Sequence, residues 1–223
     1  MDIEPQRLLN LIRISDTFFP VGSFTISQGA EQLVADGRLD KNSLPEVLRG
    51  YVDHIWRSFD LPIFYAALEA AHDEDLETIL LLDDLCFASK ITEESRSAMI
   101  KMGANLVHAT ELNRSVLGSS YASKIERGEA RGTYPVVLAM VSHELNLGEQ
   151  AAASLIYMNM IEIVAALVRM TEIDYLEAQE VMINIINDMS LETRDLADVG
   201  QSFPLVDIGS MRHEHNRSRM FIS

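Results

Sequence analysis

Apolar residues recur at spacings of three and four along nearly the whole 223-residue chain. This helical period constrains the fold more than any other feature of the sequence. No convincing run shows the alternation of apolar and polar residues that is typical of a half-buried strand. The sequence therefore predicts an all-α protein, in which short helices pack antiparallel through tight connections.

The most continuously apolar stretch lies at residues 149–170, where Asn159, Glu162 and Arg169 form only a narrow polar stripe. A helix of this kind is surrounded by other helices. We therefore expect it at the centre of a bundle of about 8–10 helices. The same polar residues argue against a transmembrane span. The N-terminal residues also lack the basic start and apolar run of a secretory signal, so we expect a cytoplasmic protein without membrane contact.

Residues 174–197 have the clearest two-faced pattern and predict one amphipathic helix. Five apolar positions are expected to point inward: Ala178, Met182, Ile185, Ile186 and Met189. No internal repeat or low-complexity linker divides the chain before residue 200. Residues 1–200 are therefore expected to form a single domain.

Residues 201–223 differ from this body and are expected to form an extended C-terminal tail. The tail has a net charge of +1, from Arg212, Arg217 and Arg219 against Asp207 and Glu214. The whole chain has a formal charge of −16, so residues 1–200 carry −17. A segment this polar buries too little apolar surface to order by itself. It is either a frayed terminus or a docking tail, in which Arg219 would bind a carboxylate and Phe221 would fill a pocket.

The acidic body excludes several classes of partner and compartment. A formal charge of −16 repels nucleic-acid phosphates and anionic lipid surfaces. A single cysteine, Cys86, excludes an internal disulfide and a thiolate metal cluster within the chain. Its apolar neighbours favour a small buried residue over a reactive thiol.

The chain has no recognisable catalytic or cofactor-binding motif. Neither glycine-rich nucleotide loop occurs, and an all-α chain lacks the strand that both need. His213 and His215 flank Glu214, but adjacent residues of an extended tail point in alternating directions and cannot converge on one ion. His143 is more simply a structural histidine at a helix end than a ligand or a base. We therefore expect no enzyme activity, no cofactor and no metal site.

The other unusual segment is the loop at residues 18–24, where three phenylalanines surround Pro20 and Gly22. Either all three rings pack into the core of the helical bundle, or at least one of them is exposed and available to contact a neighbouring chain.

The loop and the tail together resemble the UreF family of urease accessory proteins. The family motif Pro-Val-Gly-x-Phe/Tyr-x-x-Ser-x-Gly-x-Glu is similar to residues 20–31, which read Pro-Val-Gly-Ser-Phe-Thr-Ile-Ser-Gln-Gly-Ala-Glu. The family's His-Glu with a closing Arg-Leu-Phe-x-Ser resembles His213-Glu214 followed by Arg219-Met-Phe-Ile-Ser223. Order, spacing and total length also match. Ile26 and Gln28 depart from the tyrosine and histidine that are frequent at these positions.

The resemblance implies a non-catalytic, all-α protein that joins UreD (also called UreH) and the GTPase UreG in delivering nickel to apo-urease. It also implies that the C-terminal tail becomes ordered on UreD/UreH and that the protein forms a homodimer. Carried over by position, the partner-binding residues would be Pro20, Gly22, Ser23, Phe24, Arg169, His213, Glu214, Arg217, Arg219 and Phe221. The alternative from the residues alone is an acidic, all-helical interaction adaptor unrelated to nickel.

Overall fold

The computed structural model describes residues 4–110, 112–192, 195–216 and 219–221, and in these ranges the regular structure is entirely helical. The α-helices are α1 (Pro5–Ile14), α2 (Ala30–Ala35), α3 (Leu44–Tyr51), α4 (Leu61–His72), α5 (Leu76–Ser89), α6 (Glu93–Thr110), α7 (Val116–Glu126), α8 (Tyr134–Glu144), α9 (Ala151–Arg169), α10 (Tyr175–Asp188) and α11 (Pro204–His213). Short 3₁₀ turns occur at Ser23–Thr25 (η1), Leu112–Arg114, Gly148–Gln150 and Leu196–Asp198. The predicted all-α, single-domain fold is confirmed.

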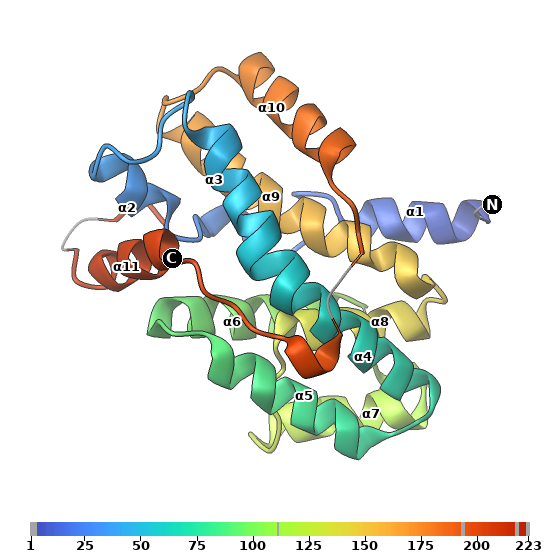
Figure 1. Cartoon of the computed structure of the whole chain (residues 1–223). Helices are drawn as coiled ribbons and strands as arrows, with labels where there is room; N and C mark the ends of the chain where they lie inside the picture. The colour runs from blue at the N-terminus through green and yellow to red at the C-terminus, as the bar shows by residue number, and fades with distance from the viewer. Residues whose placement is uncertain (1–3, 111, 193–194, 217–218, 222–223) are drawn as a thin grey trace.

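Helices α8 and α9 form the centre of the bundle (Figure 1). Every residue of α8 from Tyr134 to Ser142 is buried, because α4, α5, α6 and α9 all pack on this helix. Helix α9 packs on α1, α2, α4, α8 and α10, which confirms the central position predicted from its composition. The segment 148–169 is long and apolar enough to cross a membrane, but 67% of its most apolar window is buried inside the fold.

Helices α3 and α4 are joined without a break by a π-helical segment, Val52–Asp60. Pro62 stands in the first turn of α4 and has no N–H to donate, so the hydrogen-bond ladder must change near this point. Trp56 and Phe59 of the π-helical segment are buried in the core.

A buried carboxylate fixes the connection between α7 and α8. Asp83 of α5 is 1% exposed and accepts hydrogen bonds from the backbone N–H groups of Arg131, Gly132 and Thr133, at 2.8–2.9 Å. Its Oδ1 also accepts from the Thr133 hydroxyl at 2.6 Å. These bonds satisfy donors at the start of α8 and compensate the cost of burying the charge.

The predicted amphipathic helix over residues 174–197 is shorter than expected. Helix α10 begins with a capping box between Asp174 and Glu177, and it ends at Asp188, followed by an extended Met189. The residues at this end, Asn187, Asp188 and Ser190, are weak helix formers, which explains the early stop. Ala178, Met182 and Ile185 are buried as predicted, whereas Ile186 is 45% exposed and the inward prediction is wrong for it.

The segment expected to be an extended tail contains α11. Pro204 occupies the first turn, and Asp207 accepts a hydrogen bond from the Phe203 N–H at 3.2 Å. Val206, Gly209, Ser210 and His213 recur at helical spacing and are buried. The extended-tail expectation missed this helix because its buried face consists mostly of small and polar residues, which give no apolar period in the sequence.

Candidate functional site

Helix α11 lies beside α2, so the end of the chain returns to a segment near its beginning (Figure 1). Gly29, which precedes α2, makes this close approach possible. It has a left-handed φ of 86°, and a Cβ at this position would lie 2.8 Å from the Ser210 Oγ of α11. A larger residue would be strained in its backbone and would require the Ser210 hydroxyl to move.

His213, at the end of α11, lies between two carboxylates and is completely buried. Its Nδ1 is 2.7 Å from Oε2 of Glu94 on α6, and its Nε2 is 3.0 Å from Oε2 of Glu31 on α2. A neutral imidazole has one N–H, so only the doubly protonated ring can donate to both acids. In that form the three side chains make a buried, charge-assisted network that joins α2, α6 and α11.

Glu31 also holds the last described residues of the chain. Its Oε1 accepts from the Met220 N–H at 2.8 Å, and its Oε2 accepts from the Phe221 N–H at 3.0 Å. Burial acts to raise the pKa of Glu31, but the hydrogen bonds from Met220, His213 and Phe221 outweigh it, so the pKa lies below its ordinary value of 4.5. The carboxylate form of Glu31 is therefore the form that fits this site.

Glu94 makes the corresponding contacts from α6. Its carboxylate pairs with the Arg219 guanidinium, and its backbone N–H donates to Oε1 of Glu214 at 3.1 Å. Because this N–H belongs to the first turn of α6, Glu214 satisfies one of the free donors of a helix N-terminus. The predicted residues Glu214 and Arg219 thus both contact Glu94, one at its backbone N–H and the other at its carboxylate.

Phe221 completes the arrangement with an apolar contact. Its side chain is 4% exposed, and the Arg169 guanidinium of α9 lies 4.3 Å from the centre of its ring. This is a cation–π geometry, which favours a guanidinium over other polar groups at this position. We call the set of Glu31, Glu94, Arg169, His213, Glu214, Arg219 and Phe221 the C-terminal docking cluster.

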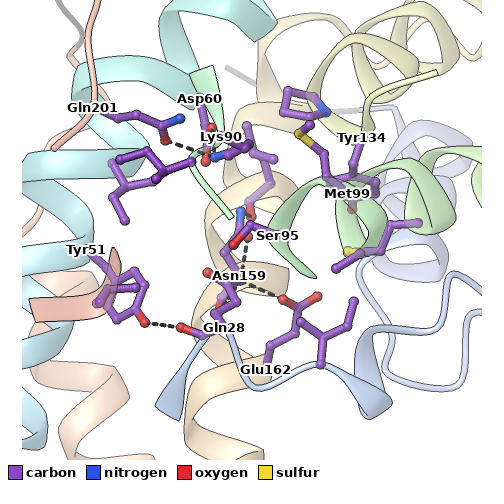
Figure 2. Close-up of a pocket in the computed structure, with 18 of the residues that line it drawn as sticks. Gln28, Tyr51, Asp60, Lys90, Ser95, Met99, Tyr134, Asn159, Glu162 and Gln201 are labelled. Atoms are coloured by element: carbon purple, nitrogen blue, oxygen red, sulfur yellow. Dashed lines mark hydrogen bonds and ion pairs between the residues drawn. The ribbon is translucent and has the colours of Figure 1, made fainter. Parts of the chain in front are cut away.

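The segment leading to α11 forms part of the wall of a partly open cavity of about 100 Å³. Figure 2 shows two polar groups on its wall: Gln28, Asn159 and Glu162 lie together, and Asp60, Lys90 and Gln201 form the other. Lys90 pairs with Asp60 and with the Gln201 side chain, each at 3.0 Å. Val206 and Asp207 of α11 also line the cavity, so the C-terminal segment supplies part of its wall.

Glu162 is the unusual group of this cavity. It is 2% exposed, and burial raises its pKa to about 8, although a hydrogen bond from Gln28 at 2.6 Å opposes the shift. Its Oε1 has no partner within the described part of the chain. The acid is therefore neutral near physiological pH, which lowers the cost of holding it in the core.

The predicted residues of the N-terminal loop do not join the docking cluster through any described contact. Pro20 is exposed, Gly22 has a left-handed φ of 89°, and the Ser23 side chain is 2% exposed. η1 packs on α9, while Asn105 of α6 donates to the Val21 carbonyl at 3.0 Å. The side chain of Phe24 and the whole of Arg217 lie outside the described residues.

The aromatic rings of this loop divide between the two interpretations of the sequence. Phe19 is buried at 8% exposure, with the Arg13 guanidinium 5.5 Å from its ring centre, whereas Phe18 is 95% exposed. One ring therefore belongs to the core and one faces outward.

The sequence predicted the C-terminal residues of the docking cluster and Arg169 of α9, but not the two body carboxylates that accept from the C-terminal segment. Glu31 and Glu94 were absent from the predicted site, as was the cavity acid Glu162. Glu31 did stand in the motif of residues 20–31, so a signal for it existed. Glu94 had none, because only the folded chain brings α6 against α11.

These features describe an all-helical protein whose C-terminal segment packs on its own body. Among the described residues, no group of three or more His, Cys, Asp or Glu could hold a metal ion. The fold and the cluster thus define the class of protein: a helical bundle with a C-terminal segment docked on its own surface.

Comparison with known proteins gives the family. A model of the UreF family matches residues 39–185. The chain is 27% identical to the urease accessory protein UreF of Actinobacillus pleuropneumoniae serotype 5b (strain L20), covering 96% of this chain and 97% of that protein. It is also 27% identical to the urease accessory protein UreF of Bacillus sp. (strain TB-90), with coverage of 97% and 99%, and 27% identical to the urease accessory protein UreF 1 of Brucella melitensis biotype 1, with coverage of 97% and 92%. The chain belongs to the UreF family of urease accessory proteins, and the predicted family is confirmed.

Proposed function

We propose that this protein is a non-catalytic scaffold that binds UreD/UreH and the GTPase UreG during GTP-dependent nickel delivery to apo-urease in the cytoplasm. The observation that carries the proposal is the docking cluster. It gathers Arg169, His213, Glu214, Arg219 and Phe221, five of the residues at which the family motif and the central helix suggested partner contacts.

The docked segment gives a physical reason for a partner surface at this place. Arg219 is partly exposed, with 39% of its side chain accessible, while its guanidinium pairs with Glu94. Met220, which lies between the partly exposed Arg219 and the buried Phe221 in the chain, is 57% exposed. A partner that covers the segment would therefore meet an arginine and an apolar side chain already held in place, which reduces the ordering cost of binding.

A homodimer is part of the same proposal, and an apolar groove supports it. The groove has a volume of about 790 Å³ and lies between α1, α9 and α10. Among its lining residues, Ile12, Tyr157, Ile186 and Leu191 are 37–55% exposed. Such a surface between helices is suited to a second copy of the chain, because it would cover apolar side chains that are otherwise in water.

The nickel step requires coupling to UreG rather than chemistry in this chain. We propose that binding selects one conformation of UreG, so that GTP hydrolysis and nickel release accompany arrival at urease. The acidic body, with its formal charge of −17, would favour basic partner surfaces and repel nucleic acid. An interaction adaptor unrelated to nickel is the alternative, and it differs in predicting no effect on UreG.

The test is co-purification with UreD/UreH of the intact chain and of a chain truncated after Asn216. This truncation keeps α11 and His213 but removes Arg219 and Phe221. We expect the truncated chain to lose the complex and Arg219→Ala to weaken it by about 1–4 kcal/mol. Arg49→Ala is the matched control, because Arg49 also pairs with an acid, Asp188 at 3.7 Å, but lies on α3.

Undiminished binding by the truncated chain would reject the docking role of the C-terminal segment. GTP hydrolysis by UreG, measured with and without the intact chain and UreD/UreH, separates the scaffold from the unrelated adaptor. An unchanged hydrolysis rate would reject the coupling.

A further inference from the structure

Two histidines from different helices meet on the surface, away from the docking cluster and the cavity. His72 is the last residue of α4, and His143 is the residue before the last in α8. Their Nδ1 atoms are 3.2 Å apart, and their ring centres are 4.9 Å apart with planes at 74°. His72 is exposed and His143 is half-buried, so both rings are accessible from solvent.

Only a limited set of protonation states fits this contact. Two Nδ1–H groups at 3.2 Å would oppose each other, so at most one of the two nitrogens carries a proton. Either one ring donates to the other, or both rings are protonated on Nε2 and both Nδ1 lone pairs are free. The second state places two neutral imidazole nitrogens side by side, which is the form in which histidine binds metals.

The two measured separations fit convergence on one ion. In imidazole, Nδ1 lies about 1.1 Å from the ring centre. If the two lines from ring centre through Nδ1 meet at one point, the separations of 3.2 and 4.9 Å place that point about 2.1 Å beyond each nitrogen. This distance equals the Zn–N bond length of about 2.0–2.1 Å. The angle at that point would be about 100°, close to the tetrahedral and octahedral values of ordinary metal geometry.

The surroundings also favour a cation. Both histidines stand at helix C-termini, where the backbone carbonyls carry the negative end of the helix dipole. The chain as a whole has a formal charge of −16. Helices α4 and α8 pack together as part of the core, so the two rings are held on a rigid frame rather than on loops.

We propose that His72 and His143 form a two-imidazole site for a divalent first-row transition ion of the Ni²⁺, Cu²⁺ and Zn²⁺ type. Imidazole nitrogen is a preferred ligand of these ions, whereas Mg²⁺ prefers oxygen. Water completes the coordination, because no third His, Cys, Asp or Glu among the described residues joins the pair. This proposal does not depend on the proposed role in urease maturation.

The test is calorimetric titration of the full-length protein with NiCl₂ and, separately, with ZnCl₂. We expect binding of one ion per chain with a Kd below about 1 mM, and at least about tenfold weaker binding by His72→Ala and by His143→Ala. His108→Ala is the matched control, because His108 is also an exposed histidine near a helix C-terminus, on α6. MgCl₂ is the control ion.

A second measurement needs no variant. In the proton spectrum, Ni²⁺ should selectively broaden the ring signals of two of the six histidines, His72 and His143. Binding that is unchanged in both alanine variants, broadening confined to other histidines, or no binding of either ion would each overturn the proposal. In the last case the contact is a neutral hydrogen-bonded pair.

Discussion

Replacing Glu31 by glutamine isolates the contribution of one carboxylate to the docked C-terminal segment. Oε2 of Glu31 accepts from His213 and Phe221, each at 3.0 Å, and Oε1 accepts from Met220 at 2.8 Å. Glutamine has nearly the same shape, but one oxygen becomes an NH₂ donor. In either orientation of the amide, at least one N–H of the segment then faces another donor.

The magnitude follows from these contacts. Glu31→Gln loses at least one hydrogen bond to a charged acceptor and leaves a donor unsatisfied, which costs about 1–3 kcal/mol. The loss falls on the packing of α11 and residues 219–221 against α2, because His213, Met220 and Phe221 supply the hydrogen bonds to Glu31. An opening equilibrium shifted by this amount changes about 5–150-fold.

Hydrogen exchange measures this opening directly. The amides of Met220 and Phe221 donate to Glu31, so their exchange in Glu31→Gln should be about 5–150 times faster than in the natural chain, while amides of α9 change little. Glu180→Gln supplies the control, since it makes the same chemical change on the exposed face of α10. Protection of both amides within about twofold of the natural chain would refute the role of Glu31. Equal acceleration throughout α9 would show global rather than local loss.

Two further predictions concern stability. Burial raises the pKa of Glu162 from 4.5 to about 8, so between these pH values the folded state holds a proton that the unfolded state has released. The free energy of unfolding should therefore fall as pH rises through this range, by on the order of 3 kcal/mol. Urea denaturation at pH 5.5 and 8.5 should show this loss in the natural chain and not in Glu162→Gln; a slope that persists in the variant would assign the effect to another group. Asp83→Ala should lower the free energy of unfolding by about 3 kcal/mol or more, because it leaves buried N–H groups at the start of α8 without an acceptor. Asp84→Ala, which removes an exposed partner of Arg131, should cost under about 1 kcal/mol in the same denaturation experiment, and equal losses would contradict the distinction between the two acids.

Most of the helical plan could be predicted from local sequence. The apolar stretch at residues 149–170 predicted the central position of α9. A helix with so few polar residues has no side that can face solvent, so it must be surrounded by other helices. Cys86 is buried as expected, and burial raises its thiol pKa to about 12. Helix ends were less certain, as residues 189–197 show, because the end of a helix depends on capping contacts as well as on the apolar period.

The candidate site was only half predictable. His213 and Phe221 stood out because they differ from an otherwise ordinary polar terminus. Of their two carboxylate partners, Glu31 lies in the motif of residues 20–31, whereas Glu94 has the sequence surroundings of a solvent-facing acid at a helix start. A carboxylate surrounded by donors from a distant segment has no local signature.

The sequence by itself determined that this chain is a helical bundle and that its end differs from its body, because helical period and charge are properties of neighbouring residues. The tertiary structure alone decided where that end lies. Contacts between His213 and residues 182 and 119 positions earlier depend on how α2, α6 and α11 pack. Gly29 permits that packing because it has no side chain to separate the helices.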